Sequence, residues 1–145
     1  MRYSLGILKP DCTRRGLVEK AFELVRGYGL KILFTKKMRF KSEDAEFLYS
    51  RCRGSNFFGN LVEFMTSGEV ILYLVEVKNG DCAIKKLNKI TGYTNPADAQ
   101  KGTLRSLGID LRENIAHSTA DEYTFWSEIR HFLTKEEISE LKLEL

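Results

Sequence analysis

Histidine, cysteine and tryptophan are all scarce in this chain of 145 residues. It has two histidines, His117 and His131, and three cysteines, Cys12, Cys52 and Cys82, which stand far apart without a CxxC pair. Disulfide frameworks and zinc sites are built from closely spaced cysteines or from cysteine and histidine clusters. The sequence therefore indicates neither a disulfide framework nor a zinc site, and we expect three reduced thiols.

A long hydrophobic run is also missing. The longest uninterrupted apolar run extends from Val70 to Val75, whereas a helix that spans a membrane needs about 20 apolar residues. The chain begins directly with the strand-like segment from Tyr3 to Leu8, without the pattern of a signal peptide. We therefore expect a cytoplasmic protein that does not act at a membrane.

A large surplus of one charge is absent, since the net charge is only +3. The basic pairs, such as Arg14-Arg15 and Lys36-Lys37, are scattered and form no continuous stripe. This balance suits an anionic small molecule or a weak affinity for nucleic acid, and does not choose between them. The 43% hydrophobic and 30% charged residues are typical of a globular protein, and we expect one domain, residues 1–145.

The most informative stretch extends from Asn114 to Glu128. A short apolar approach brings His117 to the end of an expected strand, and a helix follows with apolar residues at positions 125, 126, 129, 132 and 133. Glu128 lies at the edge of this helical stripe, from which a carboxylate can orient an imidazole. His117 is thus placed like a nucleophile or an acid–base, although an exposed histidine and a solvated glutamate remain the alternatives.

Four strands and five longer helices are expected along the chain. Hydrophobic periodicity and the positions of glycine and proline predict them. The strands are expected at 3–8, 30–40, 70–75 and 114–117, and the helices at 16–28, 42–51, 57–66, 81–89 and from about 120 to 133, with a short capped helix from Thr134. This order predicts an α/β protein of the α+β sandwich type, with a ferredoxin-like βαββαβ core, a four-stranded antiparallel sheet and helices on its faces.

The segment from Gly92 to Glu113 shows no regular pattern. So long an irregular connection in a compact domain usually has a function. It holds hydroxyl, amide and guanidinium groups within Tyr93-Thr94-Asn95-Pro96 and Gly102-Thr103-Leu104-Arg105. We interpret it as a long functional loop.

Together these segments resemble the nucleoside diphosphate kinase family over nearly the whole chain. The family's opening is similar to Ile7-Leu8-Lys9-Pro10-Asp11, its middle to Phe57-Phe58 with Met65-x-Ser67-Gly68, and its long loop to Thr94-Asn95-Pro96-Ala97-Asp98 with Gly102-Thr103-x-Arg105. Its active-site stretch is similar to Asn114-x-x-His117. Each motif alone is weak, whereas all of them in the family's order form a specific match.

The resemblance implies a role for each matching residue. His117 would be phosphorylated by a nucleoside triphosphate and would pass the phosphoryl group to a diphosphate, with Glu128 orienting it and Thr119 lending a hydroxyl. The expected nucleotide-binding residues are Lys9, Tyr49, Thr94 and Arg105 around the phosphates, Lys9 and Asn114 at the sugar, and Phe57 and Leu111 on either side of the base.

The resemblance also implies a cofactor and partners. Mg²⁺ would be bound through the nucleotide phosphates, without metal ligands from the protein, because a phosphoryl transition state needs its negative charge neutralised. Broad tolerance for bases and sugars is expected. The family further implies a homo-oligomer, a tetramer or a hexamer.

Two positions depart from the family's pattern. Asn88 stands where the family usually has a phosphate-binding arginine, and the family's Gly/Ala-Ser-Asp-Ser after the histidine is replaced by Ser118-Thr119-Ala120-Asp121. Loss of one charged contact costs about 1.5–3 kcal/mol unless a lysine substitutes. We expect an active but slower enzyme. The alternatives are a non-catalytic, nucleotide-binding scaffold or regulator and, less favoured because no RNA-recognition motif is present, a nucleic-acid-binding module.

Overall fold

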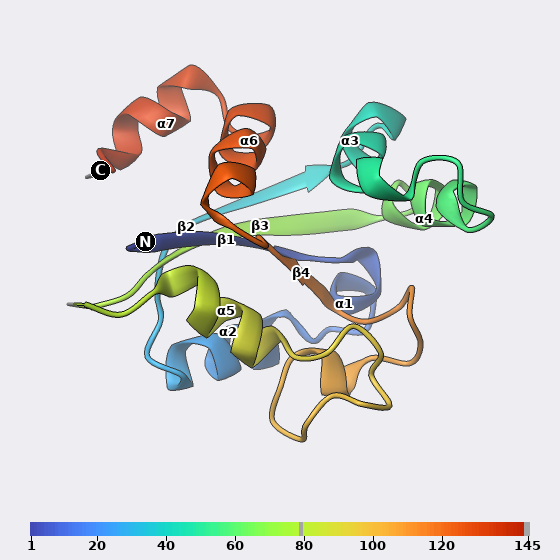
Figure 1. Ribbon diagram of the computed structural model, residues 1–145, viewed down its shortest axis with the longest axis horizontal. Helices are drawn as coiled ribbons and strands as arrows, with labels where there is room; N and C mark the ends of the chain where they lie inside the picture. Colours follow the sequence, from blue (N-terminus) through green and yellow to red (C-terminus); the bar gives the residue numbers. More distant parts are fainter. Residues whose placement is uncertain (79, 144–145) are drawn as a thin grey trace.

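A four-stranded antiparallel sheet forms the centre of the computed structural model, which describes residues 1–78 and 80–143 (Figure 1). The strand order is β2-β3-β1-β4, with β1 paired to β3 and β4 and with β2 paired to β3. The strands are β1 (Tyr3–Leu8), β2 (Lys31–Arg39), β3 (Glu69–Glu76) and β4 (Ala116–Ser118). Four antiparallel strands in this order confirm the predicted ferredoxin-like core.

Helices cover both faces of the sheet (Figure 1). One face carries α3 (Ser42–Leu48), α4 (Phe58–Met65), α6 (Glu122–Phe132) and α7 (Lys135–Leu141). The other face carries α2 (Val18–Gly27) and α5 (Ala83–Thr91). The short elements are α1 (Pro10–Arg14) and the 3₁₀ turns η1 (Ser50–Cys52) and η2 (Arg105–Leu107).

Strand β3 explains why the core has two layers. Its residues from Val70 to Val75 are all buried, and successive side chains of a strand point to opposite faces. Leu72 and Leu74 join the core under α6, whereas Tyr73 and Val75 join the core under α2 and α5. Complete burial of one such aliphatic side chain contributes about 1.5–3 kcal/mol. The strand expected at 70–75 is therefore a central strand that is covered on both sides.

Strand β1 is also covered on both sides, and it leads directly to a polar site. Proline ends it as predicted, but the short helix α1 that follows was not expected from the sequence. Pro10 is the first helical residue, where its missing N–H costs nothing and its fixed φ suits a helix. This helix places Asp11 in the protein interior, 1% exposed.

The other expected elements differ mainly at their ends. Helix α3 ends at Leu48 and continues only as the 3₁₀ turn η1. Helix α5 begins two residues later than expected and ends at Thr91, where Gly92 adopts a φ of +93°. The irregular segment from 92 to 113 contains the turn η2 and no longer helix or strand. It folds against α5 and β4 (Figure 1).

Candidate active site

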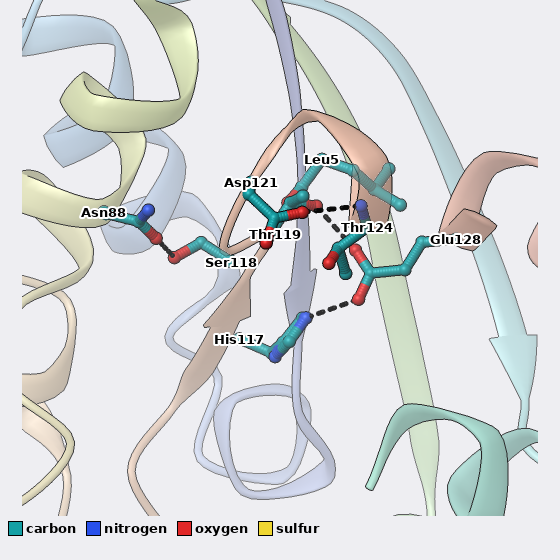
Figure 2. Close-up of polar contacts among 8 residues, drawn as sticks. All are labelled: Leu5, Asn88, His117, Ser118, Thr119, Asp121, Thr124 and Glu128. Carbon is teal, nitrogen blue, oxygen red and sulfur yellow. Dashed lines mark hydrogen bonds and ion pairs between the residues drawn. The ribbon is translucent and has the colours of Figure 1, made fainter. Parts of the chain in front are cut away.

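The pair formed by His117 and Glu128 is the centre of the polar site. His117 lies in the edge strand β4, and its Nε2 is 2.9 Å from Oε2 of Glu128 in α6 (Figure 2). The hydroxyl of Thr119 donates to the other carboxylate oxygen, Oε1, at 2.5 Å. An ionised carboxylate only accepts hydrogen bonds, so Nε2 carries the imidazole proton and Nδ1 keeps the lone pair. This geometry leaves Nδ1 as the imidazole nitrogen with a free lone pair.

Helix α6 holds Glu128 in this position. Asp121 caps the helix by accepting a hydrogen bond from the backbone N–H of Thr124 at 2.7 Å, and this bond holds the pKa of the Asp121 carboxyl below its usual value. Phe125 and Ile129 are buried against the sheet. Because Glu128 lies three residues after Phe125, it shares the buried face and points back toward β4.

A tight turn before His117 sets the direction of strand β4. The N–H of Ala116 donates to the carbonyl of Asn114 at 2.9 Å, which makes a three-residue turn centred on Ile115 with φ +79°. Such a φ is unfavourable for a β-branched residue, at about 1–3 kcal/mol. The N–H of Ile115 donates to Oδ2 of buried Asp11 at 3.0 Å, and its carbonyl accepts from the N–H of Lys9 at 2.8 Å. These bonds hold the strained turn in place.

Lys9 is an amine buried without an acidic partner. Its Nζ donates to Oδ1 of Asn114 at 2.6 Å, and the amide of Asn114 donates to the carbonyl of Thr94 at 2.8 Å. Among the residues described, no carboxylate lies within ion-pair distance of Nζ. Burial, followed by the charge of Arg105, lowers the pKa of Lys9 to about 7. The site is therefore prepared for an anion that restores the charge.

Arg105 and Tyr49 complete the polar end of the site. The guanidinium of Arg105 donates to the carbonyls of Ala116 and Gly92, both at 3.1 Å, and so joins the long loop to β4 and to the end of α5. Burial lowers the pKa of Arg105 from its usual value. The hydroxyl of Tyr49 is buried, and no residue of the described chain bonds it. A buried donor without a partner favours a ligand there.

These groups surround one cavity of about 480 Å³. Its polar end holds Lys9, Arg105 and His117, and its outer end holds the exposed apolar side chains of Phe57 and Leu111. The remaining lining residues are Tyr49, Cys52, Asn60, Leu61, Thr94, Arg112 and Asn114. All the predicted nucleotide-binding residues thus meet with His117 in one cavity, although they come from distant segments. Thr119 and Glu128 do not line this cavity, and Glu128 contacts the imidazole of His117.

The family model for nucleoside diphosphate kinase matches residues 2–138. The chain belongs to the nucleoside diphosphate kinase family. This makes the chain a phosphotransferase and confirms the resemblance found in its motifs. Family membership implies nucleotide substrates and a transfer that generally needs a divalent cation.

Curated relatives and solved structures agree with this family. The chain is 38% identical over 136 residues to the nucleoside diphosphate kinase of Novosphingobium aromaticivorans, with 93% of this chain and 95% of that protein covered. It is 37% identical over 142 residues to that of Rickettsia prowazekii, with 97% and 99% covered. Among solved structures, the Aquifex aeolicus enzyme matches with a TM-score of 0.83 and 30% identity, with 94% and 97% covered. The Halobacterium salinarum enzyme in complex with CDP matches with 0.84 and 31%, with 93% and 89% covered.

The two departures from the family's pattern have structural consequences. The Oδ1 of Asn88 accepts a hydrogen bond from the hydroxyl of Ser118 at 2.6 Å (Figure 2), so this neutral amide is attached to the residue after His117. Two lysines of the same helix, Lys85 and Lys89, are both exposed. Ala120 leaves the cap of α6 to Asp121.

Several groups with a structural effect on the site were not singled out from the sequence. Asp11 holds the turn at Ile115, Ser118 binds Asn88, and Arg112 borders the outer end of the cavity. Asp11 and Ser118 stood within quoted stretches of sequence, but neither was given a role of its own. In residues 1–78 and 80–143 there is neither a helix that could cross a membrane nor a cluster of three acidic, cysteine or histidine side chains suited to a metal ion.

Proposed function

We propose that this chain transfers the γ-phosphoryl group of a nucleoside triphosphate to a nucleoside diphosphate through a phosphohistidine at Nδ1 of His117. The observation that carries the proposal is the pairing of Nε2 with buried Glu128 beside a cavity that holds Lys9 and Arg105. Such a histidine has a free lone pair at the nitrogen that is not bound to the carboxylate. Cations at the same end of the cavity suit a phosphate chain.

The reaction proceeds in two balanced halves. Nδ1 attacks the γ-phosphorus, the bond from that phosphorus to the bridging oxygen breaks, and the nucleoside diphosphate leaves with the electron pair. Glu128 stabilises the positive charge that the phosphorylated imidazole gains. A terminal oxygen of a second diphosphate then attacks the same phosphorus, the N–P bond breaks, and neutral His117 is restored. In both halves Lys9 and Arg105 neutralise charge on the phosphates, and the hydroxyl of Tyr49 donates a hydrogen bond to them.

We propose Mg²⁺ as the divalent cation. The described lining of the cavity contains cations, amides and hydroxyls but no carboxylate, which fits an ion carried by the phosphate oxygens and not one bound by protein ligands. When bound, the ion neutralises charge on the phosphates. Lys9, Arg105 and Tyr49 are the side chains that face the same phosphates.

Broad nucleotide tolerance follows from the outer end of the cavity. Phe57 and Leu111 would hold a base by its faces, which all bases share, while Lys9 and Asn114 would bind sugar hydroxyls. The complex of the related Halobacterium salinarum enzyme with CDP supports a pyrimidine nucleotide as one substrate. Nucleic acid is disfavoured as the main partner.

We also propose that residues 1–145 act as one domain and assemble as a homo-oligomer, a tetramer or a hexamer. Strand β2 supports the assembly because it is an edge of the sheet, and an open edge can pair with another copy. The free thiols of all three cysteines suit the reducing cytoplasm.

Labelling with γ-³²P-ATP and Mg²⁺ tests the proposed nucleophile. We expect an acid-labile, base-stable phosphoprotein with its label on His117, and no label on a His117→Asn variant. His131 provides a matched control, because its Nε2 also lies 2.9 Å from a carboxylate oxygen, that of Asp44, yet it does not line the cavity. A His131→Asn variant should label like the parent. Nucleotide binding without any label would favour the scaffold or regulator instead.

A further inference from the structure

Two of the side chains that line the cavity carry an amide or guanidinium group and are exposed to solvent, Asn60 and Arg112. Arg112 directly follows Leu111 in a tight turn. Oδ1 of Asp110 accepts hydrogen bonds from the backbone N–H groups of Arg112 at 2.9 Å and of Glu113 at 2.7 Å. These two bonds fix the backbone that carries both Leu111 and Arg112. The same backbone conformation therefore determines the directions in which the side chains of Leu111 and Arg112 leave the chain.

The guanidinium of Arg112 is positioned but not occupied by a hydrogen-bond acceptor. It lies 5.3 Å from the ring centroid of Phe64, and this ring is only 5% exposed. Within the described chain the guanidinium makes no hydrogen bond and no ion pair. An aromatic platform holds a planar guanidinium by its face and leaves the five N–H donors at its edge available.

We propose that Arg112 reads the edge of the bound base and favours 6-oxopurines over adenine. This inference rests on the proposed function, in which Phe57 and Leu111 hold the base by its faces. A guanidinium only donates hydrogen bonds, and the O6 and N7 acceptors of guanine match its fork. Adenine presents an amino group in place of O6, so one donor of the fork meets another donor.

The position of Arg112 separates this role from phosphate binding. Lys9 is buried and Arg105 and His117 are partly buried, whereas Arg112 is exposed like Phe57 and Leu111, and all of these side chains line the cavity. A contact with the base is made equally in the ground state and in the transition state. Arg112 should therefore act on KM and leave kcat unchanged.

The test compares GDP, IDP and ADP as acceptors with one common donor. We expect kcat/KM to be about three- to tenfold higher for GDP and IDP than for ADP, at the lower end of a base-reading contact because the site is exposed to solvent. IDP has O6 and N7 but lacks the 2-amino group of guanine, so it identifies the edge that is read. In Arg112→Ala the ratio of GDP to ADP should fall to about one through a rise in KM for GDP.

Arg53→Ala is the matched control. The Arg53 guanidinium also lies over a ring, 5.6 Å from the centroid of Phe58, but Arg53 does not line the cavity, so this variant should keep the parent ratio. An unchanged ratio in Arg112→Ala, an equal loss for all three acceptors, or the same shift in Arg53→Ala would overturn the proposal. If no acceptor is turned over, the proposed function fails, and calorimetric Kd values for GDP and ADP still decide whether Arg112 selects the base.

Discussion

The hydroxyl of Ser118 donates a 2.6 Å hydrogen bond to the side-chain carbonyl of Asn88 and so joins β4, one residue beyond His117, to helix α5. The two positions that depart from the family's pattern therefore contact each other. A neutral pair has replaced a cation that the resemblance places near phosphate. Changes at these positions should not be independent, because residues in direct contact show coupling of about 0.5–3 kcal/mol.

Restoring an arginine at position 88 tests this pair. One charged contact to phosphate contributes about 1.5–3 kcal/mol, or roughly ten- to a hundredfold in kcat/KM. The hydroxyl of Ser118 can accept a hydrogen bond from the new guanidinium and hold it at β4. We therefore expect a small gain for Asn88→Arg and the full gain only when it is combined with Ser118→Gly. Equal gains in both backgrounds would show that Ser118 has no such effect.

We expect a neighbouring lysine to compensate in part for the missing arginine in the parent. Lys89 borders a small surface cavity together with Asn88 and Gly92, whereas Lys85 does not. We expect Lys89→Ala to lower kcat/KM by about twofold to fivefold, in the range of one exposed charged contact, and Lys85→Ala to match the parent. Steady-state kinetics of both variants measure this effect. If both variants have the kcat/KM of the parent, neither lysine compensates for the missing arginine.

The hydroxyl of Thr119 should affect catalysis through Glu128. It is completely buried and donates to the carboxylate, and a hydrogen bond to a charged group contributes about 1.5–3 kcal/mol. We expect Thr119→Val to lower kcat at least tenfold with little change in KM, since the carboxylate that orients His117 is no longer held. Thr119→Ser keeps the hydroxyl and should remain close to the parent. A serine variant as slow as the valine variant would point to packing instead.

Nucleotide binding should take up a proton at Lys9. Burial and Arg105 lower its pKa to about 7 in the free protein, against the opposing effects of Asp11 and Asp110. A bound phosphate raises this pKa again, so above pH 7 a neutral amine becomes charged on binding, and affinity falls as the pH rises. Calorimetry with ADP in buffers of different ionisation enthalpy measures the uptake. Lys9→Arg stays charged throughout, so any uptake that it retains belongs to the nucleotide or to other groups.

The same shift affects stability in the free protein. The unfolded chain binds a proton at Lys9 up to about pH 10.5, whereas the folded protein releases it near pH 7. The unfolded state therefore holds more protons between these values, and the contribution of Lys9 to stability rises with pH through this window. Lys9→Met should remove that rise from the pH dependence of Tm. An identical slope in parent and variant would refute the assignment.

Asp11 should act as a positioning residue. Its Oδ2 accepts the N–H of Ile115 in the strained turn, and a buried N–H without a partner costs about 1–3 kcal/mol. We expect Asp11→Ala to lower kcat about tenfold or more and to lower Tm, and Asp11→Asn, which retains an acceptor, to recover part of both. A loss of Tm in Asp11→Ala with kcat per folded molecule unchanged would make its role purely structural.

The sequence predicted the sheet, the long loop and the orientation of Glu128 because each has a local signal. Phe125, Ile129 and Phe132 set one buried helical face, and Glu128 could be placed relative to it. The phosphate-binding roles of Lys9, Thr94 and Arg105 came from the family resemblance, since no local pattern places three distant segments around one cavity. Their convergence is seen only in the structure.

Other features leave no local signal. Helix α1 has five residues, too few for a hydrophobic period to be detected. The positive φ of Ile115 runs against the preference of a β-branched residue, so no propensity predicts it. The bond between Ser118 and Asn88 joins two elements that are distant in sequence, and depends on how α5 packs beside β4.

The turn at Ile115 limits which substitutions the surrounding core can accept during evolution. Its side chain is fully buried in the core cluster that includes Leu8, Leu87 and Leu104, while its backbone sets the direction of the strand that carries His117. A change of volume at one of these leucines should therefore shift the same residue whose φ sets the direction of β4 and of His117, the proposed nucleophile. Cores generally tolerate volume-conserving hydrophobic exchange with small losses of stability. In the core layer around Ile115, hydrophobic exchanges that leave the protein fully folded should still lower the turnover rate. Selection should therefore act against them.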